Sequence, residues 1–337
     1  MRSPITLSLI VLVGIGWGLV APTTRLAFTL DPGVLNGFTF TVARGTWTGL
    51  AWLPIFVFLL VRERRSLDRG TLAYMLALGA IWGPGVMGLF ALATQRTALA
   101  HVVFSVGLTP VAAGLFSILV YGGSIDRMRR IGLGLGVLGV ALLGFERSGA
   151  HATFLGDGFL LAWIVAFGAY ATVASGAIRR MSALLVVASA NVIGGSIVAS
   201  TAIVVPAARD AIVAVAIHPG VAFPFFASIV LFGGFVAPLA YAYALGRAPI
   251  AVVTGGAQYL SIVAGVIVAV AWFGEPFGPL SIAAGIVLAA SLGATLLPTP
   301  RAAAAPRTLA SHANHVARRS RPTNVEAIVA NAPKIRV

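Results

Sequence analysis

Arg44 has the most distinctive chemical setting in this sequence, because it is a charged residue within a long apolar run. It lies about ten residues into that run, so a helix rising about 1.5 Å per residue would carry it roughly 15 Å deep. A guanidinium at such a depth is costly and faces either a cavity or a partner. We therefore expect Arg44 either to bind an anionic group of a solute or hold a gate, or to clamp helix-end carbonyls or a polar neighbour.

His101 is a second polar residue, placed at the start of another apolar run. Histidine titrates near neutral pH, so this side chain could couple a proton to a structural change or act in gating. The alternative is a hydrogen-bonded histidine at the membrane interface. No carboxylate falls inside the predicted apolar runs, since Asp126 and Glu275 lie in turns. This pattern weighs against proton exchange at an acid within the membrane.

Amphipathic side chains within the apolar runs form a third group of candidates. Aromatic walls with a few hydrogen-bonding tips are how a cavity in the membrane binds a small organic solute, although some aromatics will serve packing or the membrane interface. The candidates are Trp17, Trp163, Tyr170, Asn191, Tyr241, Tyr243, Gln258 and Tyr259. The substrate-binding residues that we predict are Trp17, Arg44, Trp163, Tyr241, Tyr243 and Gln258.

One short run matches the GxGxxG pattern of nucleotide sites, Gly134-Leu135-Gly136-Val137-Leu138-Gly139. It lies inside an apolar run, with no strand before it and no acid at the required distance after it, so we reject that reading. Gly132 and Gly136 form a GxxxG step, which predicts close helix packing instead. We expect no cofactor, no metal site and no catalytic residue. An integral-membrane enzyme acting on lipid-linked substrates stays an alternative, but it would need paired acids or histidines at one membrane face.

The composition is that of a membrane protein. Hydrophobic residues make up 59% of the 337 residues, charged residues only 9%, and the mean hydropathy is +0.98. Soluble domains carry roughly a quarter of their residues as charged ones. The net charge of +14 comes mostly from arginines in short loops and near the C-terminus, without interleaved aromatics. That distribution indicates membrane topology rather than nucleic-acid binding, and the absence of cysteine excludes disulfide chemistry.

The apolar runs predict ten transmembrane helices, since most reach the roughly 18 to 25 residues that cross about 30 Å of hydrocarbon. The first run is expected to be an uncleaved helix, because no small-residue cleavage site ends it. The predicted spans are Ile5–Leu26, Val34–Val61, Thr71–Ala93, Ala98–Tyr121, Ile131–Phe145, Gly158–Ile178, Leu184–Pro206, Ala222–Leu245, Ile250–Phe273 and Leu280–Leu297. Pro22, Pro84, Pro110 and Pro238 interrupt spans one, three, four and eight, which we expect to line the solute path.

The apolar part of the sequence contains an internal repeat. With a shift of about 151 positions, residues 97–145 align with residues 248–296. A shift of about 146 places Trp17 on Trp163. Repeated halves are typical of secondary transporters, which bind their substrate between the repeats. The repeat therefore bears on function as well as on fold.

The second half is predicted to insert upside down relative to the first, because five spans per half is an odd number. The first-half loop Asp126–Arg130 is basic, while its counterpart Glu275–Pro279 has no arginine. Equivalent loops with opposite charge bias are expected when they face opposite compartments. Arginines concentrate in alternate loops beginning with the N-terminus, and the positive-inside rule then places both termini in the cytoplasm.

We therefore predict an all-α integral membrane protein with ten transmembrane helices, arranged as two inverted five-helix repeats. The first repeat comprises residues 1–148 and the second residues 149–297, with Glu146–Asp157 as a short polar linker between them. Residues 298–337 form a basic tail that we expect to be disordered and to lie near anionic cytoplasmic lipids.

Short motifs recur in a characteristic order: Gly16-Trp17-Gly18, Ala43-Arg44, Thr94-Gln95-Arg96-Thr97-Ala98-Leu99-Ala100, Leu108-Thr109-Pro110-Val111, Ala244-Leu245-Gly246-Arg247-Ala248 and Phe273-Gly274-Glu275-Pro276. This series resembles the EamA-type transporters of the drug/metabolite transporter superfamily over residues 1–297. The first-half counterpart of the Gly-Glu turn departs from the family pattern and reads Gly123-Ser124. The halves also differ where Tyr241-Ala242-Tyr243 replaces Phe90-Ala91-Leu92. Both departures leave the substrate open.

The resemblance and the repeat together imply a secondary transporter that exports a small metabolite or amino-acid-like solute by alternating access, and not an enzyme. A multidrug exporter is the alternative within transport. The expected partners are a small-molecule substrate and the lipid bilayer, with a homodimer left open and nucleic acid excluded. The expected location is the bacterial inner membrane, crossed many times, with both termini cytoplasmic.

Overall fold

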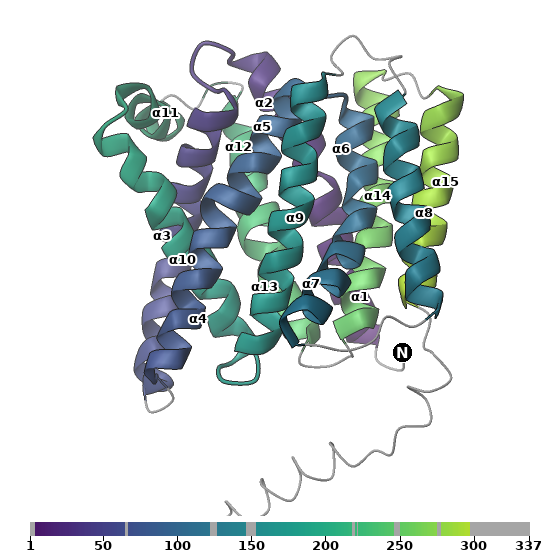
Figure 1. Ribbon diagram of the computed structural model, residues 1–337. Coiled ribbons are helices and arrows are strands. Elements are labelled where there is room, and N and C mark those ends of the chain that lie inside the picture. Colours follow the sequence, from purple (N-terminus) through teal and green to yellow (C-terminus); the bar gives the residue numbers. More distant parts are fainter. Residues whose placement is uncertain are drawn as a thin grey trace, which may run out of the picture. The chain divides into compact units, whose positions relative to one another are not determined.

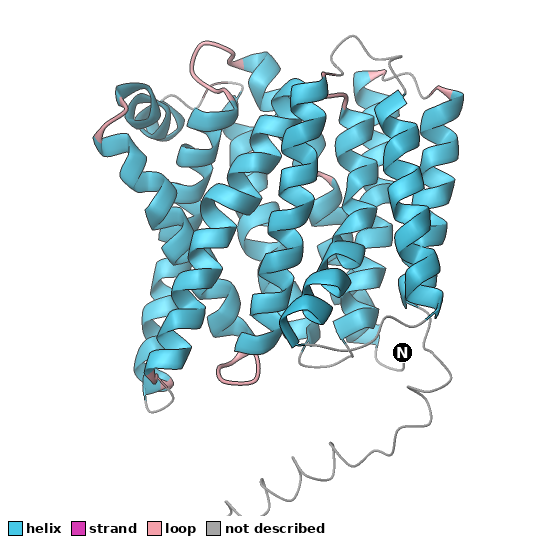
Figure 2. Cartoon of the chain, viewed as in Figure 1, coloured by secondary structure: helices cyan, strands magenta, loops and turns pink. Residues whose placement is uncertain are grey.

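The fold is entirely helical over the residues that the computed structural model describes, with no strand among them (Figure 2). These residues are 4–64, 67–121, 127–145, 153–217, 220, 222–245, 250–274 and 278–296. Met1–Leu297 forms one compact unit in which helices pack side by side (Figure 1). The tail Pro298–Val337 is a separate unit and lies outside the described residues. The prediction that it is disordered concerns those residues and stays a prediction.

The first half of the chain contains α1 (Pro4–Gly18), α2 (Val20–Leu30), α3 (Gly37–Arg62), α4 (Arg69–Ala80), the π-helix η2 (Ile81–Gly88), α5 (Leu89–Arg96), α6 (Leu99–Ser105), the 3-10 turn η3 (Val106–Leu108), α7 (Thr109–Tyr121) and α8 (Arg127–Phe145). The second half contains α9 (Phe154–Ala177), α10 (Ala183–Ser200), the 3-10 turn η4 (Thr201–Ile203), α11 (Pro206–Ile217), α12 (Ala222–Ser228), the π-helix η5 (Ile229–Val236), α13 (Ala237–Leu245), α14 (Ile250–Phe273) and α15 (Pro279–Leu296).

Eight helical stretches among the described residues are long and apolar enough to cross a membrane. They are Pro4–Leu30, Gly37–Arg62, Arg69–Arg96, Leu99–Tyr121, Phe154–Ala177, Ala183–Ile203, Ala222–Ala244 and Val253–Phe273. The shortest has 21 residues, which at about 1.5 Å per residue spans the hydrocarbon layer. Two shorter apolar stretches, Arg130–Gly139 and Pro279–Ser291, lie in α8 and α15. The predicted all-helical membrane protein is therefore confirmed, with full-length helices for eight of the ten predicted spans.

The prolines that were predicted to interrupt spans all lie at departures from α-helical geometry. The break between α1 and α2 comes just before Pro22, and Pro84 lies within η2. Pro110 follows η3 and Pro238 follows η5, each as the second residue of the next α-helix. A proline lacks an N–H and crowds the carbonyl one turn earlier, so the local hydrogen-bond pattern shifts. Pro54 lies inside α3 without such a break, so proline alone does not impose one.

The two halves of the chain interdigitate into a single bundle. The four most extensive helix contacts are α3 with α10, α8 with α15, α1 with α14, and α7 with α9. Each of these pairs joins one helix of the first half to one of the second. In Figure 1, α8 and α15 stand together at one edge of the bundle. A cavity between the halves is therefore shaped by both.

Adjacent glycines on α10 allow three helices to approach one another closely. A Cβ atom on Gly194 would lie 2.9 Å from the carbonyl oxygen of Gly79, and one on Gly83 would lie 2.4 Å from that of Gly194. On the neighbouring face, a Cβ on Gly195 would lie 2.4 Å from the carbonyl oxygen of Gly45. Backbones this close leave no room for a side chain. Helix α10 is thus wedged between α3 and η2.

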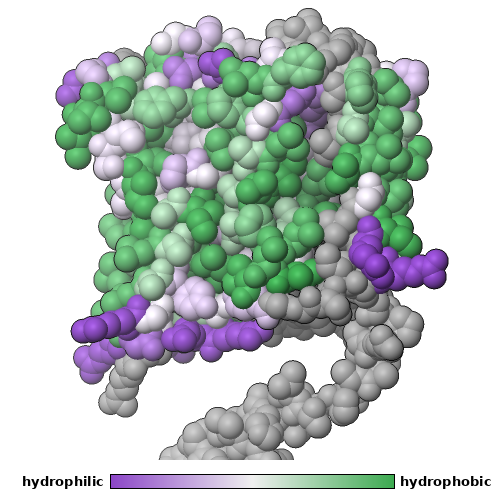
Figure 3. All heavy atoms as spheres, viewed as in Figure 1, coloured by the Kyte–Doolittle hydropathy of each residue, from purple (hydrophilic) through white to green (hydrophobic). Residues whose placement is uncertain are grey.

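The described arginines divide unequally between the two ends of the bundle. One end, here called the basic end, carries Arg62, Arg64, Arg69, Arg127, Arg130, Arg179 and Arg180. The other end, called the opposite end, carries Arg25, Arg96 and Arg209. Figure 3 shows hydrophilic residues gathered along the lower edge, below an apolar middle zone. Ion pairing is part of this basic rim, where Arg180 Nη1 lies 3.3 Å from Asp68 Oδ2.

The predicted start of the sixth span at Gly158 is wrong by one helical turn. Helix α9 begins at Phe154, because Thr153 caps it and its Oγ1 accepts a hydrogen bond from the Gly156 N–H at 3.0 Å. Asp157 therefore lies in the first turn of a membrane helix and not in a linker. The prediction that every carboxylate lies outside the spans is wrong for this residue.

The predicted end of the seventh span at Pro206 is also wrong. Helix α10 ends at Ser200, and Pro206 instead begins α11, which packs against α3. Proline suits the first position of a helix, because the N–H that it lacks has no helical partner there. The predicted spans leave residues 207–221 outside the membrane helices, and the structure places most of α11 there.

Candidate functional site

A cavity of about 410 Å³ lies between the two halves of the bundle. Helices of both halves line it, whereas α4, α8, α11, α12 and α15 contribute no described lining residue. The volume falls in the range of small-molecule sites, roughly 300 to 1,000 Å³. The wall is mostly apolar and aromatic, and its hydroxyl, amide and charged side chains are Arg44, Thr172, Ser175, Asn191, Thr254, Gln258 and Ser261, with the two tyrosines Tyr170 and Tyr241.

The cavity extends toward the basic end of the bundle. Its wall includes Ser175 and Ile178 near the end of α9, and Ala183 at the start of α10. These residues flank the short loop that carries Arg179 and Arg180. At the opposite end, the described residues around Thr97 and Asp157 are not part of the wall. The cavity is therefore one-sided in this conformation.

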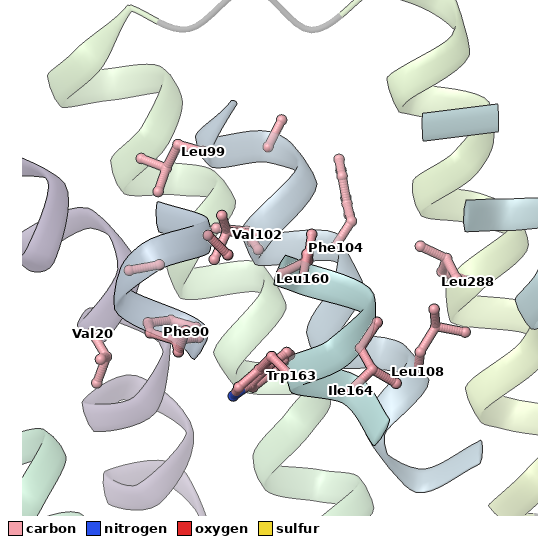
Figure 4. Close-up of a cluster of buried hydrophobic side chains, with 14 of the residues drawn as sticks. Val20, Phe90, Leu99, Val102, Phe104, Leu108, Leu160, Trp163, Ile164 and Leu288 are labelled. Carbon is pink, nitrogen blue, oxygen red and sulfur yellow. The ribbon is translucent and has the colours of Figure 1, made fainter. Parts of the chain in front are cut away.

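Tilted aromatic pairs make up much of the cavity wall, and three of them join different helices. The ring centroids of Trp17 and Tyr241 are 5.1 Å apart at an interplanar angle of 47°. Those of Phe90 and Trp163 are 5.2 Å apart at 56°, within a buried cluster drawn in Figure 4. The rings of Trp82 and Tyr170 are 4.7 Å apart at 43°. Tilted contacts at these distances are favourable for aromatic rings, so the pairs form a well-packed wall.

The first two aromatic pairs are counterparts in the sequence repeat. Trp17 aligns with Trp163 at a shift of about 146, and Phe90 aligns with Tyr241 at a shift of about 151. Each pair joins a tryptophan from one half to a single-ring aromatic from the other. Both pairs have nearly the same centroid separation, 5.1 Å and 5.2 Å.

Arg44 is the one charged side chain among the described residues that line the cavity. It lies in α3 and is only 7% exposed. Within the described part of the chain it has no carboxylate or hydrogen-bonding partner, and its Nε is buried without an acceptor. The structure gives no support to the predicted alternative of a clamp on carbonyls or on a polar neighbour. A buried guanidinium without a partner is costly, so it suits an anionic ligand.

Three more buried polar atoms of lining residues lack a hydrogen-bond partner among the described residues. They are the indole N–H of Trp82, Oδ1 of Asn191 and Oε1 of Gln258. The amide nitrogen of Asn191 donates to the carbonyl of Val187 at 2.9 Å, which leaves the amide oxygen unused. The cavity thus offers a cation, one N–H donor and two acceptor oxygens to a polar ligand.

Five of the six predicted substrate-binding residues line this cavity, namely Trp17, Arg44, Trp163, Tyr241 and Gln258. Tyr243 does not line it and is 49% exposed. Two residues along an α-helix correspond to a rotation of about 200°, so Tyr243 points away from the face that carries Tyr241. The weaker candidates Tyr170 and Asn191 also line the wall, and the side chain of Tyr259 lies outside the described part of the chain.

Trp82 and Phe90 line the cavity but were missed by sequence reasoning. A signal existed for each of them. Trp82 lies two residues before Pro84 in a span that was expected to face the solute path. Phe90 aligns with Tyr241 in the repeat, so the alignment alone placed an aromatic at the equivalent position.

His101 lies outside the cavity wall, 2% exposed, with Nδ1 2.9 Å from Oδ1 of Asp157. This geometry agrees with the predicted hydrogen-bonded histidine, and a coupling or gating role stays a prediction. Among the described residues, no group of three or more histidine, aspartate or glutamate side chains is placed to hold a metal ion.

A bundle of apolar, membrane-length helices with a solute-sized cavity between the two halves of the chain is typical of membrane transporters. The family model of the EamA-like transporter family matches residues 4–145 of this chain. The resemblance seen in the sequence motifs is thereby confirmed. The match implies a membrane transporter of the drug/metabolite transporter superfamily.

Solved structures share this fold. Thirteen of their chains match, and one, described as "Crystal structure of protein", is 18% identical, with a TM-score of 0.53. The match covers 85% of this chain and 96% of that one. At this identity the likeness shows a common fold and no more. No curated protein matches this chain.

Proposed function

We propose that this protein is a secondary transporter with two inverted five-helix repeats, which exports a small metabolite or amino-acid-like solute by alternating access. It would act in the bacterial inner membrane with both termini in the cytoplasm. The observation that carries the proposal is a cavity of about 410 Å³ that is lined by Arg44 and by two aromatic pairs that are counterparts in the repeat. Arg44 has no hydrogen-bonding or ionic partner among the described residues.

The helix contacts support the two-repeat arrangement. If the predicted spans are numbered one to ten, α1 with α14 pairs spans one and nine, and α7 with α9 pairs spans four and six. Spans one and six are equivalent positions of the two halves, and so are spans four and nine. Replacing each span by its equivalent therefore turns the pair of spans one and nine into the pair of spans six and four. The pairs α3 with α10 and α8 with α15 join spans two and seven, and five and ten, so each is unchanged by the exchange. The π-helices η2 and η5 also fall in equivalent spans, three and eight.

The charge distribution supports the inverted orientation. The described arginines concentrate at the basic end, which a positive-inside orientation would place in the cytoplasm. α1 begins at that end and α8 begins there too (Figure 1). The cavity extends toward the same end, so the conformation is the one expected to accept a cytoplasmic solute for export.

The polar atoms of the cavity favour an anionic or zwitterionic solute. The guanidinium of Arg44 matches a carboxylate or phosphate group, with the Trp82 N–H as a further donor. The oxygens of Asn191 and Gln258 match an ammonium, amide or hydroxyl donor of the same solute. The aromatic pairs provide apolar surface for its remaining atoms.

A multidrug exporter is the second candidate, and the mostly apolar and aromatic wall is the observation in its favour. Many exported drugs are lipophilic cations, which would require an acid near the site. The described lining residues include Arg44 and no acid. An anionic or zwitterionic metabolite therefore fits the charge of the cavity better.

The experiment is a comparison of solutes in the growth medium of a deletion strain, an overexpressing strain and a strain that overexpresses Arg44→Met. Solutes enriched only by the wild-type protein should carry a carboxylate or phosphate, and purified protein in liposomes should transport them. Arg209→Met, an exposed residue in α11, is the matched control and should behave as wild type. Enrichment of cations, or equal export by Arg44→Met, would contradict the proposal.

A further inference from the structure

A cluster of polar side chains joins three separate segments at the opposite end of the bundle. Asp157, in the first turn of α9, accepts a hydrogen bond from Thr97 Oγ1. Its Oδ1 also lies 2.9 Å from Nδ1 of His101, near the start of α6. An ionised carboxylate only accepts, so the proton in this contact belongs to His101 Nδ1. The cluster thus ties the start of α9 to the connection between α5 and α6.

Backbone contacts draw the same segments together. The guanidinium of Arg25, in α2, donates to the carbonyl oxygen of Thr97. The hydroxyl of Thr153 donates to the carbonyl oxygen of Arg96. A Cβ atom on Gly156 would lie 2.4 Å from that same carbonyl oxygen, so glycine is required for this close approach.

The cluster lies between the cavity and the opposite end. His101 is 2% exposed, and Val103, two residues further along α6, already lines the cavity. Along α9, Trp163 lines the cavity six residues after Asp157, a distance of about 9 Å along a helix. The side chain of Asp157 is 20% exposed, so this carboxylate is at the rim. The cluster therefore holds together the segments that close the bundle between the cavity and this end.

The contacts join the two halves of the chain, since Arg25, Thr97 and His101 belong to the first half, and Thr153 and Asp157 to the second. Alternating access in a repeat transporter moves one group of helices against the other. Contacts across that boundary must break on the side that opens. We propose that Asp157, His101, Thr97 and Arg25 form a latch that closes the cavity at the opposite end and releases when it opens there. This inference rests on the proposed transport function.

The sequence repeat supplies no counterpart of these residues at the basic end. The positions that correspond to Thr97 and His101 at a shift of about 151 are Ala248 and Val252. The position that corresponds to Asp157 at a shift of about 146 is Val11. None of these residues can reproduce the charged hydrogen bonds. The latch therefore stabilises closure at the opposite end by contacts that the repeat does not reproduce, and it shifts the balance between the two conformations.

The absence of cysteine makes a direct test straightforward. Ser261→Cys places one thiol in the cavity wall as a reporter. A membrane-impermeant maleimide is applied from each side in turn, to intact cells and to inverted vesicles. Asp157→Asn and Thr97→Val, each in this background, should raise the labelling rate from the opposite-end side about tenfold, and lower it from the basic side. A tenfold shift of a two-state equilibrium corresponds to about 1.4 kcal/mol.

Asp210→Asn is the matched control for Asp157→Asn, because it makes the same change at the same end, on an exposed side chain of α11. It should leave both labelling rates unchanged. A second variant tests the latch without changing Asp157, His101, Thr97 or Arg25. Arg96→Cys with Thr153→Cys, oxidised to a disulfide, should suppress labelling of the reporter from the opposite-end side, and reductant should restore it.

The possible failures are distinguishable. In the first case the reporter is labelled from both sides, but neither the folded latch variants nor the oxidised cysteine pair changes labelling from the opposite-end side. The latch proposal is then wrong, and the proposed transport function is not contradicted. If the reporter is never labelled from the opposite-end side in any variant, alternating access is wrong and the latch falls with it. Size-exclusion profiles of each variant establish that the protein is folded.

Discussion

The indole ring of Trp17 and the phenol ring of Tyr241 meet across the boundary between the two halves, with centroids 5.1 Å apart. Trp163 and Phe90 repeat this contact on the other side of the cavity. The two pairs have nearly the same centroid separation, and their side chains differ in one heavy atom, the Tyr241 hydroxyl, which lies 2.8 Å from Oγ1 of Thr254. Equivalent positions of the repeat therefore carry an apolar ring in the first half and a hydrogen-bonding ring in the second.

Changes at Tyr241 should separate the role of its ring from that of its hydroxyl. Tyr241→Phe keeps the contact with Trp17 and removes only the hydroxyl; we expect the substrate to lose one hydrogen bond, worth about 1 kcal/mol, so KM should rise roughly fivefold. Tyr241→Leu also removes the aromatic contact, worth about 1 kcal/mol more, and should raise KM further. Transport kinetics in liposomes at matched protein content measure both. Tyr243→Leu, two residues away and 49% exposed, is the control; if it raised KM as much as Tyr241→Leu, the cavity assignment would be wrong.

Much of the cavity could be predicted from the sequence, because its residues are unusual within apolar runs. Arg44 is identified by its depth in an apolar run, and Trp17 and Trp163 by their alignment in the repeat.

The GxxxG step formed by Gly132 and Gly136 was also a reliable signal. The Gly132 carbonyl accepts a hydrogen bond from Ser291 of α15, and a Cβ on Gly136 would lie 3.1 Å from the same hydroxyl oxygen. Close helix packing is therefore confirmed for these glycines.

Other features could not be predicted, because they depend on contacts between distant residues. His101 and Asp157 are 56 positions apart in the sequence, and Asp157 was predicted to lie in a linker. The orientation of Tyr243 required the helix phase of α13, which a uniformly apolar sequence does not reveal. In a membrane helix apolar residues face lipid as well as protein, so periodicity identifies the buried face less clearly than in a soluble helix.

Gly83→Ala should destabilise the protein, because its Cβ would lie 2.4 Å from the carbonyl oxygen of Gly194. The backbones of η2 and α10 would have to separate, at a cost of about 1 to 3 kcal/mol. Gly88→Ala, at the end of the same π-helix, is the matched control, since its nearest contact is 3.7 Å away. Thermal unfolding in detergent compares the two. Equal melting temperatures would show that this helix contact is looser than described.

The proposed orientation predicts which cysteine substitutions an impermeant reagent can reach in intact cells. Asp210→Cys, in α11 at the opposite end, should be labelled from outside. Arg127→Cys, at the start of α8 at the basic end, should be labelled only after the membrane is opened. Both chains contain a single thiol, because the natural sequence has none. The reverse pattern would place the termini outside and would overturn the export direction inferred from the cavity.

Arg44 should be required for transport yet not for stability. The structure gives it no partner among the described residues, so its removal leaves no buried charge behind. Arg44→Met keeps the length of the side chain and removes the desolvation cost of the charge, so we expect an equal or higher melting temperature. Transport of an anionic solute should be lost. Melting temperature and liposome transport, measured on the same preparation, test both parts.

Arg44→Lys distinguishes recognition by charge from recognition by geometry. Lysine keeps the positive charge but loses the planar fork that binds a carboxylate or phosphate with two parallel hydrogen bonds. We expect KM to rise about tenfold, corresponding to about 1.4 kcal/mol, with folded protein retained. Wild-type KM in Arg44→Lys would show that charge alone is sensed. A lower melting temperature in Arg44→Met would instead indicate that Arg44 stabilises the fold, as a structural clamp would.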